Sequence, residues 1–157
     1  MRINALTNFL QQFGKKILLN LELITEKNGR FFQISSALKP FVKKDFFYAG
    51  AYLGKVKKGK FFPSFNLIGM LDKQDVNTVV VGQKAAWLFI CGRDILAKSI
   101  VHLNGSCMKG SNILVLNEFG ECLGFGRIVE KLHVSEVSDA VAIRNVLDIG
   151  DFLRRER

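Results

Sequence analysis

Closely spaced turn signals divide much of the second half of the chain into short segments. Turn-forming pairs that end in glycine occupy residues 104–105 and 109–110, and residues 118–120 form a further turn. Short apolar runs bounded by such turns are typical of strands. The strands predicted in this way span residues 100–103, 113–117, 123–128 and 141–146. This spacing is typical of a small β-barrel.

One helix and one strand are expected before these short strands. Residues 78–81 predict a strand, and residues 83–91 predict a helix. Gly92 is well placed for the left-handed cap of that helix. A final turn of helix is expected after Asp148, a residue suited to an N-cap.

The first half of the chain mixes helices with hairpins. Apolar residues recur at helical spacing in residues 4–16, whereas residues 18–25 alternate as in a strand. Asn28-Gly29 favours a two-residue turn, because both positions tolerate positive φ, so residues 30–34 should return as the partner strand. The remaining expectations are a short helix at 36–44, strands at 46–56 and 60–66 around a turn at 57–59, and a closing segment at 67–71.

A polar stretch at residues 72–77 separates the two halves. The chain has 157 residues and 48% hydrophobic residues, which suffices for two small cores. We therefore predict an α+β domain with an antiparallel sheet and helices at residues 1–73. A small β-barrel should follow at residues 76–157.

The formal charge of +9 favours a polyanionic partner, because each neutralised phosphate releases counterions. The excess is uneven along the chain. Residues 1–75 hold 13 Lys and Arg against 5 Asp and Glu, whereas residues 76–157 hold 10 against 9. Nucleic acid is the first expectation for the partner.

The sequence predicts a soluble protein inside the cell. No apolar run approaches the roughly 18 residues that cross a membrane. The amino terminus shows helical spacing in place of a secretion signal. The odd, widely spaced cysteines Cys91, Cys107 and Cys122 suit reduced thiols better than a disulfide framework.

Motifs for catalysis fail at particular positions. Residues 54–60 match a phosphate-binding loop until Phe61, which stands where a magnesium-binding Ser or Thr is required. Gly124-Phe125-Gly126 lacks the third glycine of a dinucleotide fingerprint. The cysteines, His102 and His133 show no close zinc spacing. We therefore expect no enzyme activity, catalytic residue, metal, cofactor or small-molecule substrate.

Two groups of cations each allow two interpretations. The first group lies in the second hairpin and consists of Lys55, Lys57, Lys58 and Lys60. Such charges either keep a hairpin soluble or bind RNA. The second group is Arg154, Arg155 and Arg157, and composition alone favours their pairing with the nearby residues Asp148, Asp151 and Glu156.

The second half resembles a PUA domain, the RNA-binding module named for pseudouridine synthases and archaeosine transglycosylases. The motifs that carry the resemblance are Gly92-Arg93-Asp94-Ile95-Leu96, the Gly110 turn before Ile113-Leu114-Val115-Leu116, Leu123-Gly124-Phe125-Gly126, and the ending from Asp148 to Arg154. The last two are similar to the nuclear-import-protein-seven family of large-ribosomal-subunit biogenesis factors. Residues 47–67 resemble the first domain of that family. The short length and the lack of a tail after Arg157 favour an archaeal member.

This resemblance implies an RNA-binding ribosome biogenesis factor that acts in rRNA processing, with a preference for uridine-rich single strands. The protein would be cytoplasmic, or nucleolar or nuclear in a eukaryote, and its first domain would contact other ribosome-assembly proteins. Basic residues near the carboxyl end carry RNA contacts in archaeal members. The RNA-binding residues expected here are Arg154, Arg155, Arg157, Arg93, Lys98, Lys57 and Lys58. The alternatives are an RNA-targeting subunit of a modification enzyme and a protein-interaction adaptor in pre-ribosomal particles.

Overall fold

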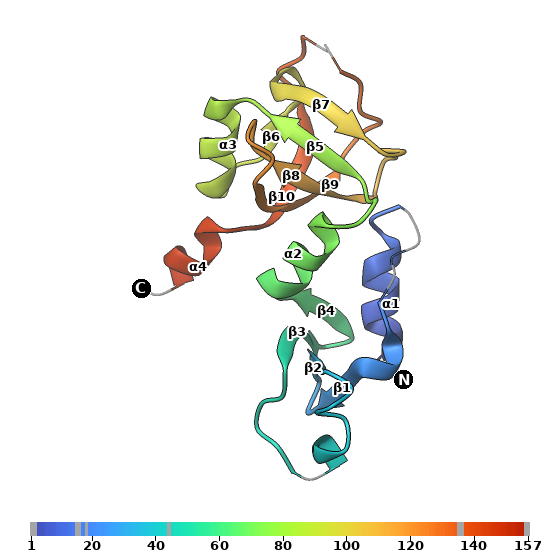
Figure 1. Cartoon of the computed structure of the whole chain (residues 1–157). Helices are drawn as coiled ribbons and strands as arrows, with labels where there is room; N and C mark the ends of the chain where they lie inside the picture. Colours follow the sequence, from blue (N-terminus) through green and yellow to red (C-terminus); the bar gives the residue numbers. More distant parts are fainter. Residues whose placement is uncertain (1–2, 15–16, 18, 44, 135–136, 156–157) are drawn as a thin grey trace. The chain divides into compact units, whose positions relative to one another are not determined.

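The computed structural model describes residues 3–14, 17, 19–43, 45–134 and 137–155. The chain forms two compact units, whose elements are labelled in Figure 1. The first unit comprises Met1–Leu10 and Ile17–Gln74, and the second comprises Gln11–Lys16 and Asp75–Arg157. The division after Gln74 lies in the polar stretch 72–77.

The first unit contains a four-stranded antiparallel sheet in the order β1-β2-β3-β4. Its strands are β1 (Ile24–Lys27), β2 (Arg30–Gln33), β3 (Ala51–Lys57) and β4 (Lys60–Pro63). Its helices are α1 (Ile3–Gln11) and α2 (Phe65–Asp72), with short 3-10 helices η1 (Leu21–Leu23) and η2 (Phe41–Lys43). The sheet and helices agree with the predicted α+β architecture.

Both predicted hairpins of the first unit are confirmed. Asn28 and Gly29 have φ values of 52° and 77°, and Lys58 and Gly59 have values of 50° and 74°. Two consecutive residues at positive φ form the turn whose twist matches that of the flanking strands. The local sequence therefore sets the pairing of β1 with β2 and of β3 with β4.

Aromatic packing fills the core of the first unit. Leu6, Phe9 and Leu10 of α1 are buried. The Phe9 ring centroid lies 5.2 Å from that of Phe61, and the Phe31 ring centroid lies 5.9 Å from that of Phe61. Burial of each such side chain contributes roughly 1.5–3 kcal/mol to the free energy of unfolding.

Three predicted elements at the start of the chain differ from the structure. The helix expected at 4–16 ends at Gln11, because Gly14 adopts a φ of 96° that helices exclude. The strand expected at 18–25 begins only at Ile24, after Asn20 caps η1 by accepting a hydrogen bond from the Glu22 backbone N–H. Residues 36–40 form turns in place of the helix expected at 36–44, and only η2 follows. Pro40 explains this last difference, because it disfavours helical backbone in the residue before it.

The strand expected at 60–66 was also too long. β4 ends at Pro63, and Ser64 then caps α2 by accepting a hydrogen bond from the Leu67 N–H at 3.3 Å. The strand expected at 46–56 begins only at Ala51, because Gly50 has a φ of 66°. The predicted closing segment 67–71 thus belongs to a capped helix.

The second unit contains a six-stranded sheet in the order β6-β10-β9-β8-β5-β7. Its strands are β5 (Thr78–Val81), β6 (Ile95–Leu96), β7 (Ile100–Asn104), β8 (Asn112–Leu116), β9 (Cys122–Ile128) and β10 (Val141–Asp148). Its helices are α3 (Gln83–Ile90), the 3-10 helix η3 (Ala97–Ser99) and α4 (Gly150–Arg155). β5 and β8 are parallel, and the other pairs are antiparallel. The predicted strand at 78–81 and helix at 83–91 are confirmed, and Gly92 has the expected positive φ of 89°.

The sheet curls without closing into the predicted barrel. Among the described residues, β6 and β7 lie at opposite edges of the hydrogen-bonded sheet. These two strands are nevertheless joined by η3 alone, so the chain itself brings the two edges together. The result is a half-barrel whose two edge strands are connected along the chain and not by hydrogen bonds between strands. Its core includes Val79, Phe89 and Ile143.

The segment Gln11–Lys16 belongs to the second unit, although the sequence assigned it to the first domain. The Phe13 carbonyl accepts a hydrogen bond from the Asn77 N–H at 3.1 Å, and the Gln12 carbonyl accepts one from Asn112 N–H at 2.7 Å. The Phe13 side chain is fully buried, with its ring 5.5 Å from that of Phe125. A fragment of residues 76–157 therefore lacks part of its own core.

We expect the variant Phe13→Ala to destabilise the second unit by about 3–5 kcal/mol, because it removes a buried ring from a core built mainly by distant sequence. Thermal unfolding followed by the fluorescence of Trp87, the one tryptophan in the chain, measures this unit. The control is Phe119→Ala, since Phe119 is 88% exposed. An equal midpoint for both variants would contradict the assignment of Phe13 to this core.

Candidate nucleic-acid interface

Arg154 ties the last helix to the end of α3. Its Nη2 donates a hydrogen bond to Oδ2 of Asp148 at 2.8 Å, and its Nη1 donates to the Ile90 carbonyl at 2.6 Å. The Asp148 side chain is 2% exposed, whereas that of Arg154 is 42% exposed. The hydrogen bond to Asp148 raises the pKa of Arg154 above its ordinary value. We call this arrangement the Arg154 clamp.

Two glycines make room for the clamp, because neither has a side chain. A Cβ at Gly150 would lie 1.9 Å from the Ile90 carbonyl oxygen, a separation that no side chain tolerates. A Cβ at Gly92 would lie 3.3 Å from Nη2 of Arg154. Two motifs of the sequence, around Gly92 and from Asp148 to Arg154, therefore meet at one structural feature.

The clamp changes the expectation for the terminal arginines. Arg154 was expected to contact RNA, and composition alone favoured its pairing with a nearby carboxylate; the structure shows the pairing with Asp148, in which the guanidinium offsets the charge of a buried carboxylate. Asp148 was expected to be an N-cap, but it accepts a hydrogen bond from Arg154, and its Oδ1 has no hydrogen-bond partner in the described part of the chain. The Arg155 side chain and Arg157 lie outside the described residues. The RNA role of the three arginines stays a prediction.

The other predicted cations are distributed over both units. Arg93 is exposed directly after Gly92, next to the clamp. Lys98 lies in η3 and forms an ion pair with Asp139. Lys57 ends β3 and Lys58 lies in the following turn, both in the first unit. The structure thus places Arg93 near Arg154, while Lys98 already has an anionic partner.

The sequence interpretation missed Trp87, whose side chain is 65% exposed on α3. Phe89, on the opposite side of this helix, is buried in the core, against which the partly buried Ala85, Ala86 and Ile90 also pack. Spacings of three and four residues place Trp87 on the same exposed face as Lys84 and Cys91. The signal was available, because Trp87 is out of phase with the apolar stripe of the predicted helix.

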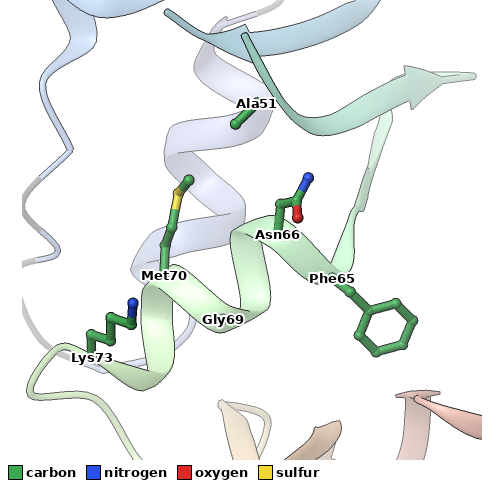
Figure 2. A pocket seen from close by; sticks show the side chains of 6 residues that line it. All are labelled: Ala51, Phe65, Asn66, Gly69, Met70 and Lys73. Atoms are coloured by element: carbon green, nitrogen blue, oxygen red, sulfur yellow. The ribbon is translucent and has the colours of Figure 1, made fainter. Parts of the chain in front are cut away.

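A shallow hollow of about 380 Å³ lies beside α2 in the first unit. It is lined by Ala51, Phe65, Asn66, Gly69, Met70 and Lys73. Figure 2 shows the Met70 and Asn66 side chains extending from the helix toward Ala51. Lys73 alone among these lining residues is ionisable, so the hollow lacks the paired groups of acid–base catalysis.

The cysteines occur as free thiols in three different environments. Burial raises the pKa of the Cys107 thiol, whose Sγ lies 3.5 Å from the Asn104 carbonyl. Cys91 is exposed. No group of three or more histidines, cysteines and carboxylates gathers as a metal site within the described residues. No helix in this part of the chain has the length and apolar character needed to cross a membrane.

Comparison with known families places residues 77–157 in the family described as the UPF0113 PUA domain. A UPF0113 protein from Archaeoglobus fulgidus is 34% identical over 116 residues. The match covers 70% of this chain and 63% of that relative, so it spans less than two thirds of the relative's length.

Two solved structures share the fold over nearly the whole chain. A conserved PUA domain protein from Thermoplasma acidophilum matches with a TM-score of 0.59 and 20% identity, covering 99% of this chain and 95% of that one. A hypothetical protein from Pyrococcus horikoshii matches with a TM-score of 0.62 and 18% identity, covering 99% and 93% respectively. At sequence identities of 20% and 18%, the similarity shows a shared fold alone.

We expect Arg154→Ala to lower the unfolding midpoint of the second unit by about 5 °C or more, because it leaves the buried Asp148 carboxylate without its cation. The matched control is Arg144→Ala, which removes an exposed arginine from β10. Adding Asp148→Asn to the Arg154 variant should restore part of the loss, since no buried charge then remains. Equal midpoints for the Arg154 and Arg144 variants would show that the clamp is dispensable.

Proposed function

This chain belongs to the UPF0113 PUA domain family, and from that premise we propose that it binds single-stranded RNA through its second unit. The observation that carries the proposal is the family match over residues 77–157, which cover nearly all of that unit. PUA domains are RNA-binding modules. The formal charge of +9 suits a polyanionic partner.

The exposed face of α3 supplies a suitable contact for an unpaired base. An indole that is 65% exposed offers a flat surface on which any base can stack. Lys84, one helical turn earlier, is placed to attract the adjoining phosphate. Because residues 76–157 are nearly neutral overall, stacking carries more of the affinity here than a broad electrostatic field does. Such a balance favours single strands over duplexes, whose bases are already stacked.

The cellular role that we propose is assembly of the large ribosomal subunit in the cytoplasm, without catalysis or cofactor. The resemblance of both halves of the sequence to the nuclear-import-protein-seven family supports this role. In that case the first unit contacts other assembly proteins.

An adaptor function is the second candidate, and the aromatic residues of the first unit bear on it. Phe61 is buried and belongs to the core, whereas Phe62 is 42% exposed. Phe41, Phe47 and Tyr48 are also exposed. Large exposed apolar side chains favour a contact surface in this unit.

We expect Trp87→Ala to weaken the binding of uridine-rich single-stranded RNA about tenfold, the value of one lost base stack. Filter binding at several salt concentrations measures the affinity and its salt dependence. Trp87→Phe should retain most of the affinity, and Phe119→Ala should match the unchanged protein. Failure of the folded, unchanged protein to bind uridine-rich RNA at low salt would overturn the proposed function.

Crosslinking in cell extract, followed by sequencing of the attached RNA, tests the cellular role. We expect most sequences to derive from precursors of the large-subunit ribosomal RNA, and the yield to fall for Trp87→Ala. Sequences drawn mainly from transfer RNA or from guide RNA would instead support the targeting subunit of a modification enzyme.

A further inference from the structure

Strand register aligns a row of cations on one face of the first sheet. Arg30 of β2 lies opposite Lys55 of β3, and Lys55 lies opposite Phe62 of β4. Lys57 lies opposite Lys60 in the same hairpin. Directly paired residues, and residues two apart along a strand, share one face of a sheet. We call this set of residues the basic face: Arg30, Lys55, Lys57, Lys60 and Phe62.

The alternate residues of the same strands lie on the opposite face of the sheet, as strand geometry requires. Phe31 and Phe61, which alternate with Arg30 and Phe62 along their strands, are buried on the other face with Phe9 of α1. Burial raises the pKa of Tyr52, and the charge of Arg30 opposes that rise. In the register of the sheet, Tyr52 lies opposite Phe32, two residues along β2 from Arg30.

The basic face pairs like charges directly across strands. Arg30 faces Lys55, and Lys57 faces Lys60, an arrangement that destabilises a sheet. Each of these cations is exposed, and none forms an ion pair or hydrogen bond with a side chain in the described ranges. Lys27, at the end of the same row, is by contrast paired with Asp45.

Protection of a sheet edge does not account for this charge. Lysines on edge strands prevent unwanted strand pairing, which would explain Lys60 on β4. Arg30 and Lys55, however, lie on β2 and β3, the two interior strands. Like charges on interior strands indicate an anionic partner that offsets their repulsion.

Aromatic rings lie beside these cations. The Lys60 ammonium is 5.8 Å from the centroid of Phe62, and the Arg30 guanidinium is 5.8 Å from that of Phe47. The two rings are 42% and 84% exposed. An acidic protein surface would form ion pairs with the cations and leave the rings exposed to water. An unpaired nucleotide can instead place its phosphate beside the cation and stack its base on the ring.

We propose that the basic face, with Phe47 at its side, is a second binding surface for single-stranded RNA. The inference rests on the proposed function of the chain as an RNA-binding protein and adds a contact in the first unit. Neighbouring cations repeat at roughly 5 Å across strands and roughly 7 Å along a strand, so several phosphates of one strand are within reach.

The test uses the full chain with the double variant Lys55→Glu and Lys60→Glu. We expect the affinity for a uridine-rich RNA to fall about tenfold or more, and the slope of log affinity against log salt to decrease by about 1.4 as two phosphate contacts are lost. The control is Lys39→Glu with Lys73→Glu, which changes the net charge equally at exposed sites outside the basic face. The control should lose less than about threefold in affinity and keep its unfolding midpoint. The basic-face variant should unfold at a higher temperature than the unchanged protein, because each glutamate then faces a cation across the strands.

Phe62→Ala separates RNA from other anions. We expect it to weaken RNA binding about tenfold and to leave heparin binding unchanged, because heparin has no bases to stack. Equal losses in the two lysine variants would overturn the proposed surface. Wild-type RNA affinity for Phe62→Ala, with tight binding of heparin or polyglutamate at the basic face, would identify a site for acidic proteins and also overturn it.

The outcomes distinguish this surface from the proposed function. If the basic-face variants bind RNA normally while Trp87→Ala binds weakly, the second unit is the RNA site and the basic face is not. If the unchanged protein binds no RNA, both proposals are overturned. Losses in both sets of variants, multiplying when combined, would support two separate contacts.

Discussion

Two buried amides hold the second unit together. Asn77 and Asn112 are almost completely buried, and their side-chain N–H groups are hydrogen-bonded, whereas neither Oδ1 has a hydrogen-bond partner in the described part of the chain. Asn112 donates from its side chain to Gln12, and the Asn77 side chain approaches the Asn112 carbonyl at 3.5 Å. The Asn77 carbonyl in turn accepts a hydrogen bond from Leu114 in β8. These contacts join the segment Gln11–Lys16 to the starts of β5 and β8.

The glycines around Asn77 show how closely this junction is packed. A Cβ at Gly105 would lie 2.2 Å from Oδ1 of Asn77, and a Cβ at Gly14 would lie 2.6 Å from its Nδ2. Both glycines also have positive φ, so two properties of glycine are used at once. The curled sheet, and with it the position of α3 and Trp87, depends on a junction whose parts are widely separated in the sequence.

The sequence predicted what local chemistry determines. Asn28-Gly29 set the first hairpin, and the helix 83–91 followed from its apolar stripe and Gly92. The sequence could not predict that Phe13 belongs to the second unit, because its partners lie more than sixty residues away. The basic face also required knowledge of register, since Arg30 and Lys55 become neighbours only when β2 pairs with β3. The pairing of Arg154 with Asp148 could be expected from their closeness in the sequence, whereas its hydrogen bond to the Ile90 carbonyl of α3 could not, because no motif names that group.

The cations of the basic face lack the carboxylate partners that several other cations of the described chain have. In the second unit Arg154 and Lys98 each have a carboxylate partner, and Arg127 donates to Gln12. In the first unit the paired like charges lower the stability of the sheet that carries them. Salt screens such repulsion, so the sheet is least stable in dilute solution, where the proposed binding of RNA would be tightest. Added salt and RNA bound to the basic face, as proposed above, would therefore both stabilise the first unit by weakening the same repulsion, and each would reduce the effect of the other.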